Sequence, residues 1–223
     1  MRTLLFDIDG TLLLTNNGGS RALSQAIATE FGVDQPNIDV TYGGRTDRSL
    51  LAQLLSINQL PNNQEFRERL QQRYTSLFPA VLKEVGGRVF PGVQQLLAKL
   101  HDHPGVHVCV MTGNVEETGR EKLRHFDLLK YIQWVSGGQH DADRSDMARR
   151  TADMIGQQFG PADRDIIVIG DTAADVQCGH AIGAKVIAVC TGSHDRSRLE
   201  SEQPFATLDD LSDTDAVFDM LVS

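Results

Sequence analysis

Cysteine is scarce in this chain, and no hydrophobic run is long enough to cross a membrane. The three cysteines, Cys109, Cys178 and Cys190, are odd in number, widely spaced and set near apolar residues. This pattern predicts buried free thiols rather than a disulfide framework or a metal knuckle. A short leucine pair near the N-terminus is interrupted by Asp7, so neither a signal peptide nor a membrane helix is expected. These features favour a cytoplasmic protein, because reducing conditions keep thiols free.

Positive charge is also in short supply. Lys and Arg together number 21 against 30 Asp and Glu, which gives a formal net charge of −9, and no dense basic run occurs. Nucleic acids and anionic membranes attract basic patches, so neither is an expected partner. A small anionic metabolite can still bind through local charges. The composition, 40% hydrophobic and 23% charged, is that of an ordinary globular protein with a substantial core. We expect a monomer or a homodimer.

What the chain does contain is an alternation of apolar strands and helical segments. Continuous β-branched or apolar runs, as expected of strands covered on both faces, occur at residues 3–6, 106–111, 165–169 and 185–189. Helical patterns occupy residues 93–100, 115–125, 146–158, 173–182 and 213–221. This alternation predicts an α/β fold with a doubly wound, Rossmann-like parallel sheet.

The region between residues 15 and 88 breaks the alternation, because it carries no convincing strand. Its helical patterns lie at residues 20–31, 47–55 and 64–85. We therefore expect an inserted α-helical domain over residues 16–87, with residues 1–15 and 88–223 forming the Rossmann-like core. Glycine-containing segments at both ends of the insertion, residues 16–19 and 86–87, are candidate hinges.

The first predicted strand leads directly into two carboxylates, Asp7 and Asp9, separated by one residue. In extended backbone these two side chains point the same way, while Ile8 faces the opposite side and anchors the segment in the core. Like charges this close raise one pKa or recruit a cation, and oxygen ligands suit Mg²⁺ better than Zn²⁺. The pair therefore predicts a Mg²⁺ site with a catalytic role.

Thr112-Gly113-Asn114 follows the second predicted strand and opens a helix. A hydroxyl and free backbone N–H groups at a helix N-terminus suit a phosphoryl group, and Gly113 lets a ligand approach the main chain. The alternative is simple helix capping by Thr112 or Asn114.

Asp171 and Asp175 lie at the exit of the strand at residues 165–169, about one helical turn apart. Both can face the mouth of the sheet, where open α/β folds bind ligands. Alternatively they serve as a helix cap and a first-turn acid. Arg144, in a polar loop before a helix, could supply fixed positive charge, although an isolated arginine is more often a solvated surface residue.

In this order, the segments resemble the motifs of the haloacid dehalogenase superfamily of aspartate-nucleophile phosphohydrolases. The match comprises Asp7-x-Asp9-Gly10-Thr11, then Thr112, then a basic residue, and finally Gly170-Asp171-Thr172-x-x-Asp175. The basic residue is often lysine in this superfamily; here the resemblance assigns this position to Arg144, with Lys122 and Lys130 poorly placed as substitutes. The insertion resembles the helical C1 cap of phosphoglycolate phosphatase-like and β-phosphoglucomutase-like members.

The resemblance implies a Mg²⁺-dependent phosphatase that hydrolyses a small phosphorylated metabolite, such as phosphoglycolate or a sugar phosphate. Asp7 would attack phosphorus to form an aspartyl-phosphate, and Asp9 would donate a proton to the leaving group and then deprotonate water. Thr112, Arg144 and the loop of Gly113 and Asn114 would hold the transferring oxygens. The metal site would comprise Asp7, Asp171, Asp9 through its backbone carbonyl, and Asp175, which orients Arg144 or a metal-bound water.

The inserted domain is expected to select the substrate. Its loop at residues 42–47 precedes a helix and resembles the specificity loop of such caps. Arg45 and Thr46 would then contact an anionic or hydroxylated leaving group. Alternatively, Thr46 or Asp47 caps the helix and Arg45 is solvated.

Asp9 favours phosphoryl transfer over dehalogenation, because the resemblance implies that dehalogenases need no second acid two residues after the nucleophile. Two alternatives stay open. A β-phosphoglucomutase-like phosphotransferase would share the core site and differ in how well the closed cap excludes water. A non-catalytic phosphoacceptor or sensor would use the same sheet, but it would need neither the second acid nor the insertion.

Overall fold

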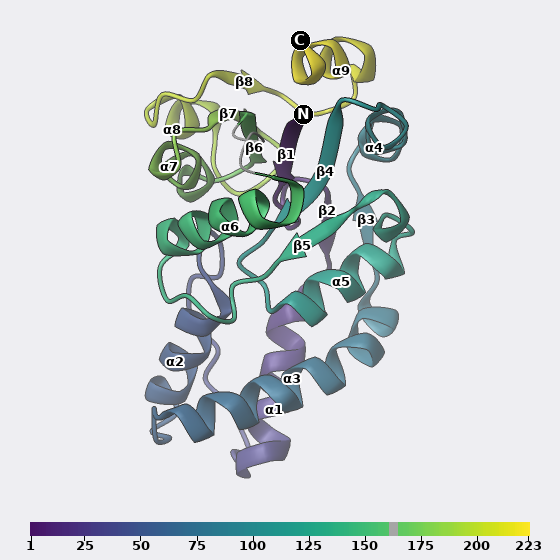
Figure 1. The fold of residues 1–223 in the computed structure, drawn as a ribbon. Coiled ribbons are helices and arrows are strands. Elements are labelled where there is room, and N and C mark those ends of the chain that lie inside the picture. The colour runs from purple at the N-terminus through teal and green to yellow at the C-terminus, as the bar shows by residue number, and fades with distance from the viewer. Residues whose placement is uncertain (161–164) are drawn as a thin grey trace.

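A six-stranded parallel sheet forms the centre of the computed structural model, which describes residues 1–160 and 165–223 (Figure 1). Its strands are ordered β5-β4-β1-β6-β7-β8, and every neighbouring pair is parallel. The strands are β1 (Arg2–Phe6), β4 (Val106–Met111), β5 (Trp134–Ser136), β6 (Asp165–Gly170), β7 (Lys185–Val189) and β8 (Ala206–Leu208). The chain adds strands first on one side of β1 and then on the other, which confirms the predicted doubly wound sheet.

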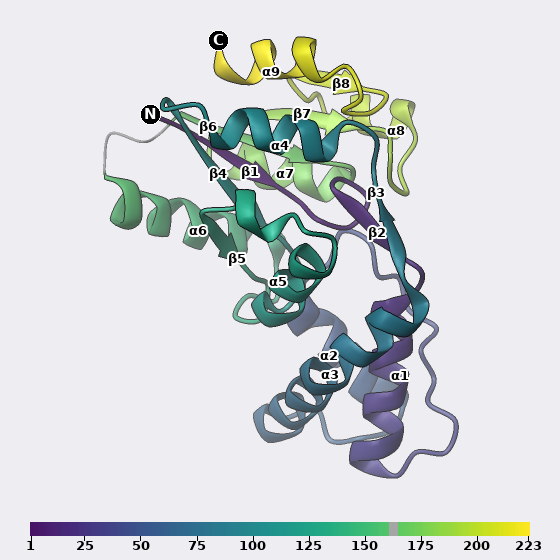
Figure 2. The same cartoon turned by 90° about the vertical axis from the view of Figure 1, so that its right-hand side faces the viewer.

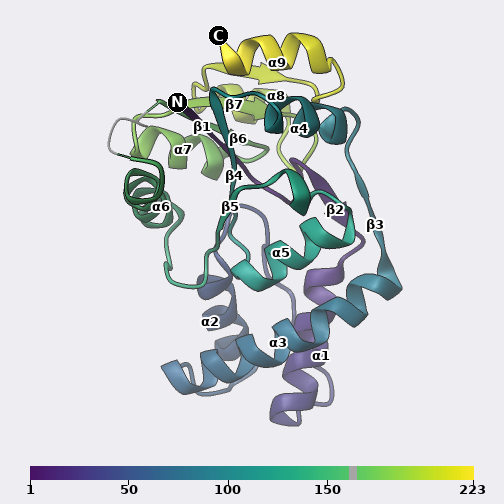
Figure 3. The same ribbon diagram turned by 45° about the vertical axis from the view of Figure 1, so that its right-hand side comes forward.

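Helices cover both faces of this sheet (Figure 3). Leu4 and Phe6 of β1 belong to one apolar cluster and Leu5 to the other, as the alternation of side chains along a strand requires. The first cluster includes α4 (Val93–His101), α5 (Glu116–His125) and α9 (Thr214–Val222). The second includes α6 (Arg144–Phe159), α7 (Ala173–Ala181) and α8 (Arg196–Glu200). Cys109 and Cys178 are buried in the second cluster, and all three cysteines are free, as predicted.

Three short elements of the core were not predicted from the sequence: β5, β8 and α8. The two strands lie at the edges of the sheet and have three residues each, and α8 has five. Segments this short show no measurable hydrophobic period. A single-turn 3₁₀ helix, η1 (Leu129–Tyr131), precedes β5.

The segment predicted as the insertion contains three helices, α1 (Gly18–Phe31), α2 (Asp47–Ile57) and α3 (Gln64–Val85). They enclose an apolar cluster of their own, which includes Leu23, Ile27, Leu54, Phe78 and Leu82. In Figure 2 these helices lie on the side of the sheet opposite the two chain termini. We call this unit the cap. Within the described part of the chain, no helix is sufficiently long and apolar to cross a membrane.

The chain enters and leaves the cap through a two-stranded antiparallel ribbon of β2 (Leu13–Thr15) and β3 (Gly87–Val89). The expectation that residues 15–88 contain no strand is therefore wrong at both ends. The ribbon has only three residues per strand, too few for a sequence pattern. Asn17 and Gly86, within the segments predicted as hinges, both have positive φ angles, of 58° and 65°.

Candidate active site

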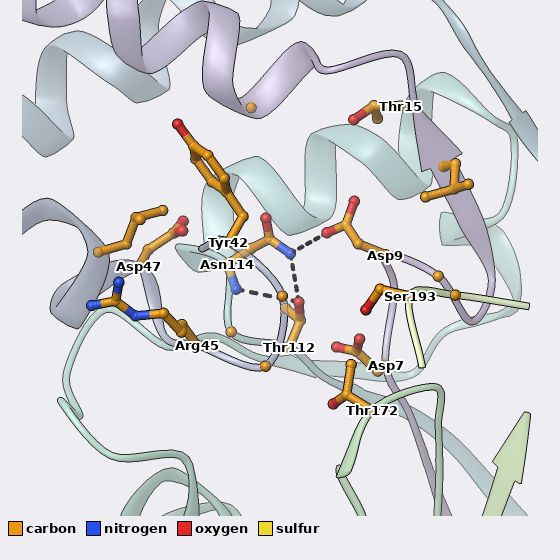
Figure 4. Close-up of a pocket in the computed structure, with 18 of the residues that line it drawn as sticks. Asp7, Asp9, Thr15, Tyr42, Arg45, Asp47, Thr112, Asn114, Thr172 and Ser193 are labelled. Atoms are coloured by element: carbon orange, nitrogen blue, oxygen red, sulfur yellow. Dashed lines mark hydrogen bonds between the residues drawn. The ribbon is translucent and has the colours of Figure 1, made fainter. Parts of the chain in front are cut away.

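A cavity of about 480 Å³ lies between the carboxyl ends of the strands and the cap (Figure 4). The residues that line it from the core include Asp7, Asp9, Thr112, Gly113, Asn114, Lys122, Arg144 and Asp171. Those that line it from the cap include Tyr42, Arg45, Asp47, Leu50 and Tyr74. Parallel strands end at one edge of the sheet, and this brings segments far apart in the sequence to a single site.

Three buried carboxylates, those of Asp7, Asp171 and Asp175, form one cluster at the core end of the cavity. One ligand oxygen from each residue lies within 4.8 Å of the others. Burial, and then the charge of Asp175, raises the pKa of Asp7 well above its usual 3.8 and the pKa of Asp171 to about 7. Oxygen donors that repel one another when ionised fit a hard divalent cation such as Mg²⁺.

Asp175 also has hydrogen-bond partners within the protein. The backbone N–H and hydroxyl of Thr172 donate to Asp175 Oδ2, at 3.0 and 2.6 Å, in a capping box at the start of α7. Arg144 Nη2 donates to Asp175 Oδ1. Asp175 is thus both the first-turn acid of α7 and the partner of Arg144. A metal ion bound directly by Asp175 would have to share its two carboxylate oxygens with these hydrogen bonds.

Arg144 is the first residue of α6 and is buried, with 8% of its surface exposed. Its guanidinium lies between two acids, because Nη2 is 3.7 Å from Asp7 Oδ1 and also bonds to Asp175. Its Nε is buried and has no hydrogen-bond partner among the described residues. The structure therefore places Arg144 against the acidic cluster and not on the solvated surface.

Thr112 is fully buried at the end of β4. Its hydroxyl accepts hydrogen bonds from the backbone N–H and the side-chain Nδ2 of Asn114, at 3.3 and 2.6 Å. Neither residue caps α5. The first N–H groups of that helix, on Val115 and Glu116, instead donate to Asp47 Oδ2 at 2.7 Å and Gln139 Oε1 at 3.1 Å. The simple capping alternative thus does not describe this loop.

Asp9 turns away from the acidic cluster. Its Oδ2 accepts hydrogen bonds from Asn114 Nδ2 at 2.7 Å and from Lys122 Nζ at 2.5 Å (the Asn114 bond is drawn in Figure 4). Lys122 was considered only as a substitute for the third-motif basic residue, and its contact with Asp9 was not predicted. Lys122 lies on the face of α5 that lines the cavity. Which face of α5 does so depends on how the helix packs under the cap.

The two predicted cap contacts, Arg45 and Thr46, have other partners in this structure. The Arg45 guanidinium donates to Ser49 O at 3.0 Å and to Gln53 Oε1, and it points away from Asp7 and Thr112 (Figure 4). Thr46 is the buried N-cap of α2, accepting from Ser49 N at 3.3 Å, and it does not line the cavity. The capping alternative therefore describes Thr46.

Sequence reasoning considered Asp47 only as a possible helix cap and missed that it connects the cap to the core. Its backbone N–H donates to Gly113 O at 2.6 Å, and its carboxylate accepts from the Val115 N–H. Burial raises the pKa of Asp47 to about 6. A Cβ at Gly113 would overlap the carbonyl of Arg45, so the contact between cap and core needs glycine there. The hydrophobic period of the cap helices does not indicate which face of the cap contacts the core.

Comparisons with known proteins agree with this geometry. The model of the family described as haloacid dehalogenase-like hydrolase matches residues 4–189. A phosphoglycolate phosphatase of Aquifex aeolicus (strain VF5) is 25% identical over 221 residues, which cover 96% of this chain and 94% of the relative. A 5'-nucleotidase of Pseudomonas aeruginosa is 26% identical over 216 residues, which cover 90% and 88% of the two chains.

Among solved structures, a hydrolase from Pseudomonas syringae superimposes with a TM-score of 0.72 at 22% identity and covers 100% of both chains. At that identity the likeness establishes the fold alone. The family model spans most of the chain, and further relatives that match almost the whole chain are also phosphoglycolate phosphatases. The chain therefore belongs to the haloacid dehalogenase-like hydrolases and is a phosphatase of that family.

Proposed function

We propose that this phosphatase is Mg²⁺-dependent and hydrolyses a small phosphorylated metabolite through an aspartyl-phosphate intermediate. The observation that carries the proposal is the cluster of Asp7, Asp171 and Asp175 beside the buried guanidinium of Arg144. It brings to one end of a ligand-sized cavity a carboxylate that would act as the nucleophile, oxygens that would hold a cation, and a buried positive charge.

The residues of the cluster fit Mg²⁺. Asp7 and Asp171 would hold the ion together with the backbone carbonyl of Asp9, while Asp175 would hold Arg144 in place. When bound, the ion would neutralise the repulsion between the anionic nucleophile and an anionic substrate. The raised pKa values of Asp7 and Asp171 support this assignment, because a cation would remove the mutual repulsion that contributes to them.

The reaction would proceed in two steps. In the first, a carboxylate oxygen of Asp7 attacks phosphorus, the bond to the leaving oxygen breaks, and Asp9 gives that oxygen a proton. In the second, Asp9 takes a proton from a water molecule that attacks the aspartyl-phosphate, which returns Asp7 and releases phosphate. Arg144, the Thr112 hydroxyl and the Gly113 N–H would hold the transferring oxygens; similar preorganised donors contribute about 10²- to 10³-fold each.

The cap would contact the rest of the substrate. We propose a phosphoglycolate-like compound or a sugar phosphate, since the cap side of the cavity carries hydroxyls from Ser20 and Tyr42. Among the residues that the structure describes, Arg45 donates only to neutral acceptors, on Thr41, Ser49 and Gln53, so its charge stays available to an anionic group after a side-chain rotation. A β-phosphoglucomutase-like reaction would use the same core residues with water excluded from the closed cavity.

The test is turnover of p-nitrophenyl phosphate with and without Mg²⁺, followed by a panel of phosphorylated metabolites ranked by kcat/KM. We expect Mg²⁺-dependent phosphate release that Asp7→Asn abolishes, while Asp127→Asn, an exposed control outside the cavity, is unchanged. Stable phosphorylation by acetyl phosphate without turnover would instead indicate a sensor. Conversion of a sugar monophosphate to its isomer would indicate a mutase.

A further inference from the structure

Asp9 is the most accessible acid of the site, and within the described part of the chain only one of its oxygens has hydrogen-bond partners. Its side chain is 36% exposed and lines the cavity, and Oδ2 accepts from both Asn114 and Lys122. Oδ1 has no hydrogen-bond partner within residues 1–160 and 165–223. Because two N–H donors already point at Oδ2, a proton on Asp9 has to reside on Oδ1.

Lys122 also determines the orientation of Asn114. Lys122 Nζ donates to Asn114 Oδ1 at 2.7 Å, and Asn114 Nδ2 donates to Asp9 Oδ2 and to Thr112 Oγ1. If the amide were flipped, its oxygen would face the Asp9 carboxylate and its NH₂ would face the ammonium group. Lysine has donors only and an ionised carboxylate has acceptors only, so the network admits one arrangement.

Lys122 is buried, and because burying a charged ammonium group destabilises the fold, its position favours a function for this group. Its side chain is 4% exposed, and its Nζ lies 5.7 Å from the ring centroid of Phe78 in the cap. Taking an ammonium group out of water is unfavourable, and an apolar residue of similar size is often at least as stable at such a site. Of the lysines that the structure describes, Lys122 is the one that lines the cavity.

We infer that Lys122 is a positioning residue for acid–base chemistry: together with Asn114 it holds Asp9 Oδ2, so that Oδ1 faces the cavity as the proton donor and acceptor. This inference rests on the proposed function. The proton moves from Oδ1 to the leaving oxygen as the phosphorus–oxygen bond breaks, and in the second step from the attacking water to Oδ1.

The test compares two aryl phosphates that differ in their need for a proton. Nitrophenolate leaves from p-nitrophenyl phosphate without protonation, whereas the more basic phenolate leaves from phenyl phosphate with the help of an acid. For Lys122→Met we expect kcat/KM, which reports the first step, to fall about 100-fold on phenyl phosphate and less than about fivefold on p-nitrophenyl phosphate. Lys122→Arg, which keeps a charged donor, should recover part of the lost activity on phenyl phosphate.

Lys130→Met is the matched control, because Lys130 is half-exposed and paired with Asp127 outside the cavity. It should leave both rates unchanged. Equal losses on the two substrates in a Lys122→Met protein of unchanged circular dichroism would overturn the inference. If that variant folds poorly, Lys122→Gln provides the same comparison. A wild-type enzyme that hydrolyses neither ester with Mg²⁺ would instead refute the proposed function.

Discussion

Asp47 of the cap and Gly113 of the core are joined by a backbone hydrogen bond of 2.6 Å, and the Asp47 carboxylate accepts from the N–H of Val115, two residues further on. The loop expected to bind phosphate and the loop expected to select the substrate are therefore one connected unit. A displacement of the cap would break these two hydrogen bonds or move Gly113 with it.

Gly113→Ala tests this connection. A Cβ at residue 113 would overlap the carbonyl of Arg45, so the cap cannot dock as it does here. We expect kcat/KM to fall about 100-fold, as is typical when reacting groups move by about 1 Å. Gly156→Ala in α6 is the control, because a Cβ there meets nothing within 4 Å. Equal activity of the two variants would contradict the connection.

Asp47 should make stability depend on pH. Its pKa is raised from 3.8 to about 6, so between these values the unfolded chain loses a proton that the folded protein keeps. Stability from this group is complete below about pH 4 and falls by about 3 kcal/mol as the pH rises to about 6.

Asp47→Asn removes this titration and keeps an oxygen that can accept from the Val115 N–H. In urea unfolding at pH 4, 5, 6 and 7, the variant should gain stability relative to wild type as the pH rises. Asp34→Asn, at an exposed position, is the control. If the difference in free energy of unfolding between the variant and wild type were constant across this range, the pKa of Asp47 would be the same in the folded and unfolded chains, which would contradict the prediction.

Asp171→Asn should weaken the activation of the enzyme by Mg²⁺ but raise the stability of the metal-free protein. Loss of a charged ligand should raise the Mg²⁺ concentration needed for half-maximal activity by at least about tenfold, since even indirect partners contribute that much. Without Mg²⁺ at pH 8.5, the variant should melt at a higher temperature, because Asp171 no longer repels Asp7 and Asp175. A lower melting temperature would argue against the mutual repulsion.

The pair of Arg144 and Asp175 can be tested with a double-mutant cycle. Asp175→Ala leaves a buried guanidinium without its partner and should cost about 3–5 kcal/mol in urea unfolding. Adding Arg144→Met removes the stranded charge, so the double variant should be more stable than Asp175→Ala alone. Additive losses would mean that the two side chains act independently.

The sequence predicted the parts of this molecule that depend on local pattern and chain order. Runs such as residues 165–169 identify strands covered on both faces, and parallel strands end at one edge. This is why Asp7 and Asp171, which lie at two strand ends, could be expected to meet. The same reasoning located the three cap helices, because each is long enough to show its period.

What could not be predicted depends on how elements face one another. Lys122 is one of several charged residues on α5, and only the packing of that helix turns it toward Asp9. Thr46 fits a cap and a ligand contact equally well until the position of α2 is known. Edge strands such as β5 have too few residues for a pattern, and their pairing with β4 is what forms them.

The register of the small ribbon pairs Thr15 with Gly87, so the cap leaves and rejoins the core at one point. Removal or exchange of the whole cap would therefore leave a gap that a tight turn can close, with the path of the six-stranded sheet undisturbed. An engineer could graft a different lid between these two positions and alter which phosphate esters are admitted, while the carboxylates beneath stay as they are.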